Sequence, residues 1–166
     1  MPSLNGHFYA VLSGATSYDD AIQRAAASSY QGLTGYLATI DSVAEYALLR
    51  WSVKIDRAWV SGTDAAQEGT WRFNTGPSSG TTANLLWAAF EPNGWNVENC
   101  AVHIEIGVVD TSCNNQGISS FVVEYDCPAP KIVFQGACIR MCLYLLSSHK
   151  SCIQSCFFFL FHRAYL

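Results

Sequence analysis

The residues with the most evident chemistry lie between positions 91 and 99, where Glu91, Asn93, Glu98 and Asn99 surround Pro92. This is a dense group for a chain in which only 13% of the residues are charged. A carboxylate accepts hydrogen bonds and a side-chain amide donates them, so a Glu–Asn pair that flanks a cation can hold a hydroxyl group. On a solvated loop the same carboxylates would by default be ordinary surface charges, and both interpretations stay open at this point.

Composition limits the classes of function. The chain has 166 residues, a net charge of −4 and 50% hydrophobic residues, which suits one domain with a buried core plus an appendage. This charge balance offers no basic surface for DNA or RNA, so nucleic-acid binding is not expected. The sequence holds no G-x-S-x-G, H-E-x-x-H or P-loop motif, and we therefore expect no enzymatic activity.

A change in composition divides the chain at residues 126–130, where two prolines interrupt regular structure. Residues 127–166 contain five of the seven cysteines among apolar runs, and charged residues break those runs before they reach the roughly 20 residues that span a bilayer. We interpret this Cys-rich apolar segment as a poorly specified extension. The alternatives are a helical hairpin joined by disulfides through its two C-x3-C pairs, and a membrane-associated tail.

Patterning predicts the elements that must position the polar residues. Residues 16–30 and 42–54 predict helices, and the second opens with the capping box Ser42-x-x-Glu45. Apolar, branched and aromatic runs predict strands at 6–14, 35–40, 58–62, 69–73, 101–109 and 121–125. A stretch as long and as irregular as 74–99 is usually functional or disordered in a compact domain. Two early helices followed by short strands indicate an α+β domain.

The order of these segments resembles that of the C-type lectin-like domain. The resemblance rests on GHFYAV, SYDDAIQRA, LATIDSVAE and AWVSGTDAAQEGTWRF, followed by EPN, Glu98-x-Cys100 and Cys113. It covers residues 5–126, which we take as the domain. It implies the C-type lectin fold, with two helices, small antiparallel sheets and a long calcium-binding loop region. It also implies a disulfide between Cys100 and Cys113.

The resemblance implies a calcium ion held by oxygen atoms of Glu91, Asn93, Glu98 and Asp110, next to a cis Glu91–Pro92 bond. Calcium takes six to eight such oxygen ligands. In the family, EPN accompanies binding of mannose, GlcNAc or fucose-like sugars. The sugar would contact Glu91, Asn93, Glu98 and Trp95, whereas Trp59, Trp71 and Trp87 are expected in the core. An auxiliary metal site in some relatives would correspond to Asp64, Glu68 and Asn99.

Two departures from the family pattern bear on function. Val108-Val109-Asp110 stands where the family has Trp-Asn-Asp, so Val109 supplies neither an oxygen ligand nor an amide donor. We expect calcium binding to be weakened and sugar affinity to be low, and Asn114 or Asn115 could lean in as a replacement. The family's outer disulfide would fall near Ala25 and at Val123, where this chain has no cysteine.

These observations predict a non-enzymatic, calcium-dependent lectin module of the mannose type. The alternative is a calcium-independent protein-interaction domain on the same scaffold. The family implies an extracellular or secretory location, and a disulfide requires an oxidising compartment. The first ten residues, however, have neither the basic nor the apolar region of a secretory leader, so we expect either an intracellular protein or a fragment.

Overall fold

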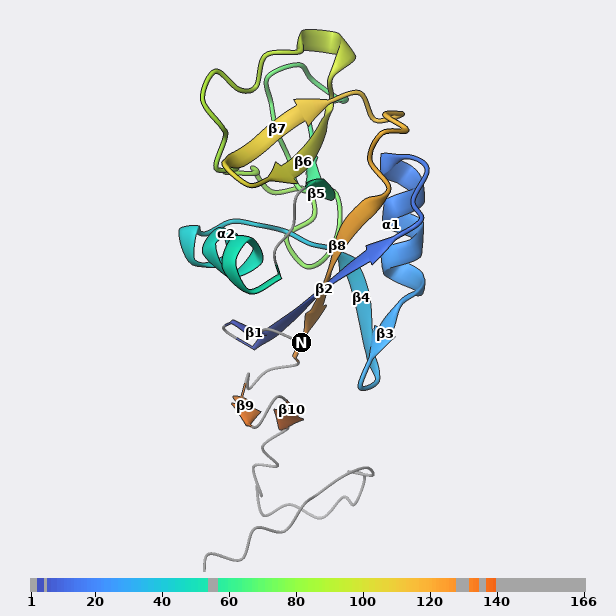
Figure 1. Cartoon of the computed structure of the whole chain (residues 1–166), viewed down its shortest axis with the longest axis vertical. Helices are drawn as coiled ribbons and strands as arrows, with labels where there is room; N and C mark the ends of the chain where they lie inside the picture. The colour runs from blue at the N-terminus through green and yellow to red at the C-terminus, as the bar shows by residue number, and fades with distance from the viewer. Residues whose placement is uncertain (1–2, 5, 54–56, 128–131, 135–136, 140–166) are drawn as a thin grey trace, which may run out of the picture.

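The computed structural model describes residues 3–4, 6–53, 57–127, 132–134 and 137–139 (Figure 1). Most of the Cys-rich extension, including the second C-x3-C pair, lies outside the described residues. Within it, β9 (Ile132–Phe134) and β10 (Ala137–Ile139) pair with each other in antiparallel fashion.

The described part of the domain is organised around one mixed sheet. Its strands are β1 (Ser3–Leu4), β2 (His7–Ser13), β3 (Ser29–Tyr30), β4 (Leu33–Leu37), β5 (Arg57–Thr63), β6 (Cys100–Ile104), β7 (Gly107–Thr111) and β8 (Ser120–Asp126). Their order along the main path is β1-β2-β8-β5-β6-β7, and the β3–β4 hairpin joins through β4 and β8. Strands β2 and β8, near the two ends of the domain, pair from His7 opposite Asp126 to Ser13 opposite Ser120. The α+β prediction is confirmed.

Both predicted helices form, and both are shorter than predicted. Helix α1 (Tyr18–Ala27) begins after Ser17, whose side chain caps the Asp20 N–H, and it ends where Ser28 turns into extended backbone. Helix α2 (Val43–Leu48) has the predicted capping box between Ser42 and Glu45, and a π-helical segment (Leu49–Val53) follows it. Serines that favour caps and turns explain why α1 stops short of residue 30.

Two strand predictions are wrong in detail. Residues 69–73 contribute only isolated bridges, through Arg72 to Thr63 and Thr82. The predicted strand 101–109 is instead the hairpin β6–β7, in which Ile104 pairs with Gly107. Gly107 has φ +155° and a Cβ there would lie 2.6 Å from the Ala88 nitrogen, so glycine is needed at the turn. The alternating apolar residues on both sides concealed that turn in the sequence.

The core consists of two buried clusters on the sheet. Trp59 is fully buried and Trp71 packs edge-to-face on the half-buried Trp87 at 4.7 Å, so all three tryptophans lie in the core as predicted. Ala25 and Val123, the positions of the missing outer disulfide, lie together in the second cluster. Apolar packing therefore occupies the place of that covalent bond.

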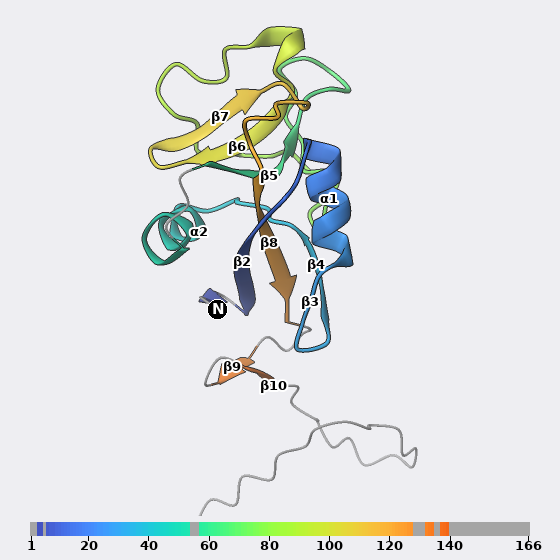
Figure 2. The same ribbon diagram turned by 45° about the vertical axis from the view of Figure 1, so that its right-hand side comes forward.

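The long loop rises from the β5–β6–β7 side of the sheet, at the opposite end of the domain from β1 and the tip of the β3–β4 hairpin (Figures 1 and 2). It leaves β5 at Thr63 and returns at Cys100, where β6 begins. The disulfide between Cys100 and Cys113 ties this return to the segment that follows β7, with a Cα–Cα distance of 5.1 Å, and confirms the predicted pair. Cys127, after β8, is also disulfide-bonded.

Candidate functional site

Asp110 on β7 anchors the EPN segment. Its carboxylate, only 6% exposed, accepts hydrogen bonds from the backbone N–H groups of Asn93 (3.1 Å to each oxygen) and Gly94 (2.8 Å). The Glu91–Pro92 bond is cis, as the resemblance implied. The sheet therefore fixes one predicted ligand, Asp110, directly beneath the segment that carries Glu91 and Asn93.

Glu91 lies in an electrostatically unfavourable position. Burial, a hydrogen bond shared with Asp110 and the negative charges of Asp110 and Glu98 raise its pKa to about 7. One oxygen, Oε2, is buried and has no hydrogen-bond partner among the residues that the structure describes. A carboxylate held in this way is short of positive charge and of donors.

Glu98 reaches the same region because the chain folds back through a short 3-10 turn, Trp95–Val97. A Cβ on Gly94 would overlap the Glu98 side chain, so the absence of a side chain at Gly94 lets Glu98 approach. We name Glu91, Glu98 and Asp110 the loop carboxylate cluster. The side chains of Asn93 and Trp95, which lie between Glu91 and Glu98 in sequence, are exposed, Trp95 by 76%.

The residues predicted for the auxiliary site show a similar shortage of partners. Asp64 is buried, and its Oδ2 accepts from the Gly69 N–H at 2.9 Å. Its Oδ1 and the Oδ1 of Asn99 are buried and have no partner in the described part of the chain. Glu68 is exposed, and desolvation and the charges of Asp64 and Asp110 raise its pKa. The charges of Glu68 and Asp110 therefore lie within reach of each other.

The oxygen atoms fit a hard divalent cation in kind. Glu91 Oε2, Asp64 Oδ1 and Asn99 Oδ1 are carboxylate or amide oxygens, the ligands that calcium prefers, and each lacks a partner among the described residues. Their arrangement is not that of a closed metal site, because no group of three His, Cys, Asp or Glu side chains in the described residues is placed to hold a metal ion. Carboxylates of like charge repel one another, so a cation would have to draw them together.

The side chain of Val109 takes part in core packing. Val109 is half-buried against the second core cluster. Asn115 does not replace it, because its Nδ2 donates to Thr111 Oγ1 at 3.0 Å and its Oδ1 accepts from the Gly117 N–H at 3.0 Å. Asn114 is exposed. Asn115 therefore does not supply the ligand that is expected to be missing at Val109.

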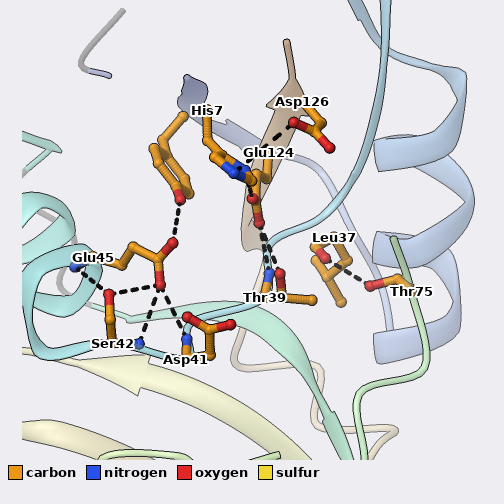
Figure 3. A network of polar contacts seen from close by, with 10 residues as sticks. His7, Leu37, Thr39, Asp41, Ser42, Glu45, Thr75, Glu124 and Asp126 are labelled. Carbon is orange, nitrogen blue, oxygen red and sulfur yellow. Dashed lines mark hydrogen bonds and ion pairs between the residues drawn. The ribbon is translucent and has the colours of Figure 1, made fainter. Parts of the chain in front are cut away.

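A second carboxylate group, which the sequence analysis did not predict, lies between β2, α2 and β8 (Figure 3). Glu45 accepts from the Tyr9 hydroxyl at 3.0 Å and from the Ser42 N–H and hydroxyl at 3.1 and 2.9 Å. Glu124 contacts His7 and accepts from the Thr39 N–H and hydroxyl at 2.9 and 3.1 Å. We name these residues (His7, Tyr9, Thr39, Ser42, Glu45 and Glu124) the Glu124 network. Its sign in the sequence was a glutamate, Glu124, inside the apolar strand FVVEY.

The fold defines a class of protein: the domain has the C-type lectin fold. Among solved structures, the mouse scavenger receptor C-type lectin carbohydrate-recognition domain has a TM-score of 0.62 and 21% identity, over 75% of this chain and 92% of that one. The cow CD23 carbohydrate-recognition domain, solved in the presence of a GlcNAc2Man3 oligosaccharide, has a TM-score of 0.57 and 21% identity over 72% and 87%. A calcium-independent type II antifreeze protein has a TM-score of 0.58 and 17% identity over 73% and 87%.

Curated proteins are similar over part of their length. Halomucin of Haloquadratum walsbyi is 32% identical in a match of length 134 that covers 73% of this chain and 1% of halomucin. Lectin BRA-3 of Megabalanus rosa is 31% identical over 98 residues, 59% of this chain and 57% of that lectin. The chain thus spans only a small piece of one relative and just over half of the other. No family model matches the sequence.

The alternative of a membrane-associated tail concerns residues that mostly lie outside the described part of the chain. No helix among the described residues is long and apolar enough to cross a bilayer.

Proposed function

We propose that residues 5–126 form a calcium-dependent carbohydrate-binding module for mannose-type sugars, and that residues 127–166 are an extension outside it. The observation that carries this proposal is Glu91: its buried Oε2 has no partner in the described chain, while burial and the neighbouring Asp110 and Glu98 raise its pKa. A calcium ion would supply the missing positive charge and, with it, coordination sites for two neighbouring hydroxyl groups.

The residues of the chain would divide the work of recognition. Glu91 and Glu98, once ionised, accept hydrogen bonds from sugar hydroxyls, and the Asn93 amide donates to a hydroxyl oxygen. Asp110 holds the Asn93 and Gly94 backbone in place through three hydrogen bonds and adds negative charge for the cation. Trp95, which is 76% exposed, would offer an aromatic face to the ring of the sugar. No step of this scheme makes or breaks a covalent bond, so we propose no enzymatic activity.

The similar proteins support this choice of ligand. The mouse domain is a carbohydrate-recognition domain, the cow domain was solved with an oligosaccharide that contains mannose and GlcNAc, and BRA-3 is a lectin. The Cys100–Cys113 disulfide supports an oxidising, extracellular or secretory location. Because Val109 contributes no ligand, we propose weak affinity rather than tight binding.

Retention on immobilised mannose tests the proposal. The wild-type protein should be retained in millimolar calcium and released by EDTA or by free mannose. Glu91→Ala should not be retained, whereas Glu105→Ala, which changes an exposed glutamate on the β6–β7 turn, should behave as wild type. Retention that is indifferent to EDTA and to Glu91→Ala would contradict calcium-dependent binding.

The second candidate is a calcium-independent interaction domain on the same fold. Two observations favour it: Val109 packs into the core where a ligand was expected, and a calcium-independent antifreeze protein shares the fold. Thermal melting separates the two candidates, because a ligand that binds the folded state raises its stability. A melting temperature that millimolar calcium leaves unchanged would favour this second function.

A further inference from the structure

An open groove lies between the C-terminal end of β2 and the end of α1, two segments that Figures 1 and 2 show side by side. It has a volume of about 510 Å³, and it is lined by Arg24, Ala27 and Ser28 together with residues 11–13 and Phe121. None of these residues belongs to the loop carboxylate cluster or to the Glu124 network. The groove is therefore a separate candidate site.

Apolar surface of β2 stays open in this groove. Leu12 pairs with Phe121 across the sheet, and Phe121 packs in the same core cluster as Ala21 and Ala25 of α1. Directly opposed residues place their side chains on the same face of a sheet, so the Leu12 side chain points to the face that α1 covers. It is nevertheless 37% exposed, and the neighbouring Val11 is 36% exposed. An apolar side chain that covered this surface would gain free energy.

The backbone of β2 alternates between β8 and the opposite side. At the two ends of the strand, even-numbered residues bond toward β8: the Cys127 N–H donates to Gly6 O at 3.0 Å, and the Gly14 N–H donates to Ser119 O at 2.9 Å. The register between the two strands is unbroken over the whole of β2. Residues of an antiparallel strand alternate in the side to which their backbone groups point, so the odd-numbered residues of β2 point away from β8.

This outer edge is unoccupied where β2 borders the groove. Val11 and Ser13 direct their backbone N–H and C=O groups to it, whereas β1 pairs with β2 only as far as Phe8. No other strand of the described chain pairs on that side. The free stretch also carries none of the charged or proline residues that deter pairing with another chain. An unprotected edge next to an apolar groove marks a place where a further strand can add.

Arg24 adds hydrogen-bond donors at the end of the groove. Its Nε donates to the two carboxylate oxygens of Asp20 at 3.0 and 2.9 Å, and neither Nη atom has a partner among the residues that the structure describes. A Cβ on Gly14, the residue after β2, would lie 3.6 Å from Nη1, which places the guanidinium where the strand ends. Terminal guanidinium nitrogens with free N–H groups suit a carboxylate.

An extended peptide matches the groove, the edge and Arg24 at once. Its backbone can pair with the free edge of β2, and residues two apart in an extended chain lie on the same face. One of them can place an apolar side chain in the groove while the other places a carboxylate at Arg24. A fatty acid would match the groove and Arg24 but would leave the edge unpaired. A β2 strand from a second copy, HFYAVLS, would pair with the edge but brings no carboxylate.

We propose that the edge of β2 and the groove beside α1 bind an extended peptide of a partner protein, in which an apolar residue and an Asp or Glu stand two positions apart. The proposal goes beyond carbohydrate binding. No residue of the long loop lines the groove, so this site requires neither calcium nor sugar.

Selection from a phage library of random heptapeptides tests the proposal, with the full chain as bait and EDTA in the buffer. We expect enrichment of peptides that carry an aliphatic or aromatic residue two positions from Asp or Glu. The most enriched peptide, labelled with fluorescein, is then titrated by fluorescence anisotropy. Arg24→Gln should weaken its binding about threefold, because an exposed charge pair contributes little and Asp20 already offsets part of the charge of Arg24.

Two further variants test the groove and the edge separately. Ala27→Phe fills the groove from an exposed position of α1 and should weaken binding about tenfold, whereas Ala26→Phe, at an exposed position that does not line the groove, should bind as wild type. Val11→Pro removes an outward N–H from an edge strand, where proline is tolerated, and should weaken binding about fivefold. If Val11→Pro fails to fold in thermal melting, Ala27→Phe still decides the outcome.

Each other outcome overturns the inference. Absence of any enriched sequence, or binding that Ala27→Phe leaves unchanged, would show that the groove takes no peptide. Enriched peptides without an acidic residue would contradict the ligand chemistry assigned to Arg24. Self-association in analytical ultracentrifugation that Val11→Pro abolishes would assign the edge to a second copy of the chain instead. Because every measurement is made in EDTA, none of these outcomes bears on the proposed binding of sugar.

Discussion

The Glu124 network and the loop carboxylate cluster contain the same chemical groups in opposite circumstances. In the network, both oxygens of Glu45 and both of Glu124 have partners, supplied by Tyr9, Ser42, Thr39 and His7. In the loop cluster, Glu91 has a buried oxygen without a partner in the described chain and shares its surroundings with two other acids. A buried carboxylate whose oxygens all have partners is compatible with a stable fold, whereas one with an unpartnered oxygen is a candidate for binding a ligand.

The largest effect should follow from breaking the network. Glu124→Ala removes an acceptor that is 1% exposed and leaves the Thr39 N–H and His7 without it. We expect a loss of about 3 kcal/mol in the free energy of unfolding, measured by urea denaturation. Glu105→Ala, at an exposed glutamate, is the control and should change stability by less than about 0.5 kcal/mol. If Glu124→Ala lowered the free energy of unfolding only slightly, the network would not contribute to stability.

A second experiment distinguishes the loop carboxylate cluster from another buried ionisable group, His103, by the pH dependence of stability. Burial lowers the pKa of His103 to about 4, and neither ring nitrogen has a partner among the described residues. The unfolded chain therefore binds a proton more readily, and stability should fall as the pH falls from about 6.5 toward 4. His103→Leu should be more stable than wild type at pH 4 by about 2 kcal/mol, a difference that vanishes near pH 7. If the stability of wild type and of His103→Leu fell equally with pH, His103 would not be the group responsible.

The loop carboxylate cluster should change stability with pH in the opposite direction from His103. The pKa of Glu91 is raised to about 7, so its protonated form stabilises the calcium-free protein at low pH and that contribution is lost as the pH rises through 7. Glu91→Gln removes this cost, and we expect it to raise the stability of the calcium-free protein at pH 8 by about 1 kcal/mol, after allowance for partial solvent screening. The gain should disappear at pH 4.5. Destabilisation by Glu91→Gln at pH 8 would mean that Glu91 is already well satisfied.

The smallest effect concerns Val109. Val109→Asn adds an amide oxygen beside Asp110 in sequence, and we expect calcium and mannose to bind a few-fold more tightly, at a loss of about 1 kcal/mol in stability from the weakened packing. Calcium titration measures the change in affinity, and denaturation of the same variant measures the change in stability. Unchanged calcium affinity would show that position 109 faces the core in the folded protein whatever residue it holds.

The sequence predicted the features that depend on local chemistry. The Ser42–Glu45 capping box and the tryptophans of the core are present, because a short motif and strong apolar patterning define them, and the Cys100–Cys113 pair is present as the resemblance implied. The β6–β7 turn and the end of α1 were missed, since a glycine between apolar residues and a run of small residues carry weak signals. The Glu124 network could not be predicted, because His7, Thr39 and Glu124 meet only through tertiary folding.

The candidate site was only partly accessible to sequence reasoning. Glu91, Glu98 and Asp110 were predicted together through the resemblance, and the structure brings their charges within mutual influence. The exposure of Phe90 was not predicted, because an exposed phenylalanine in a loop has no periodic pattern to identify it. Exposure and a positive φ, which are properties of the folded backbone, single it out.

Calorimetric titration of calcium into the metal-free protein tests the central claim most directly. If Glu91, Glu98 and Asp110 converge on one cation, the wild type should give a saturable heat with at least one calcium per chain at pH 8, and Glu91→Gln should abolish it. Absence of any saturable heat, or a titration that Glu91→Gln leaves intact, would contradict the account of this loop as a metal-dependent binding site.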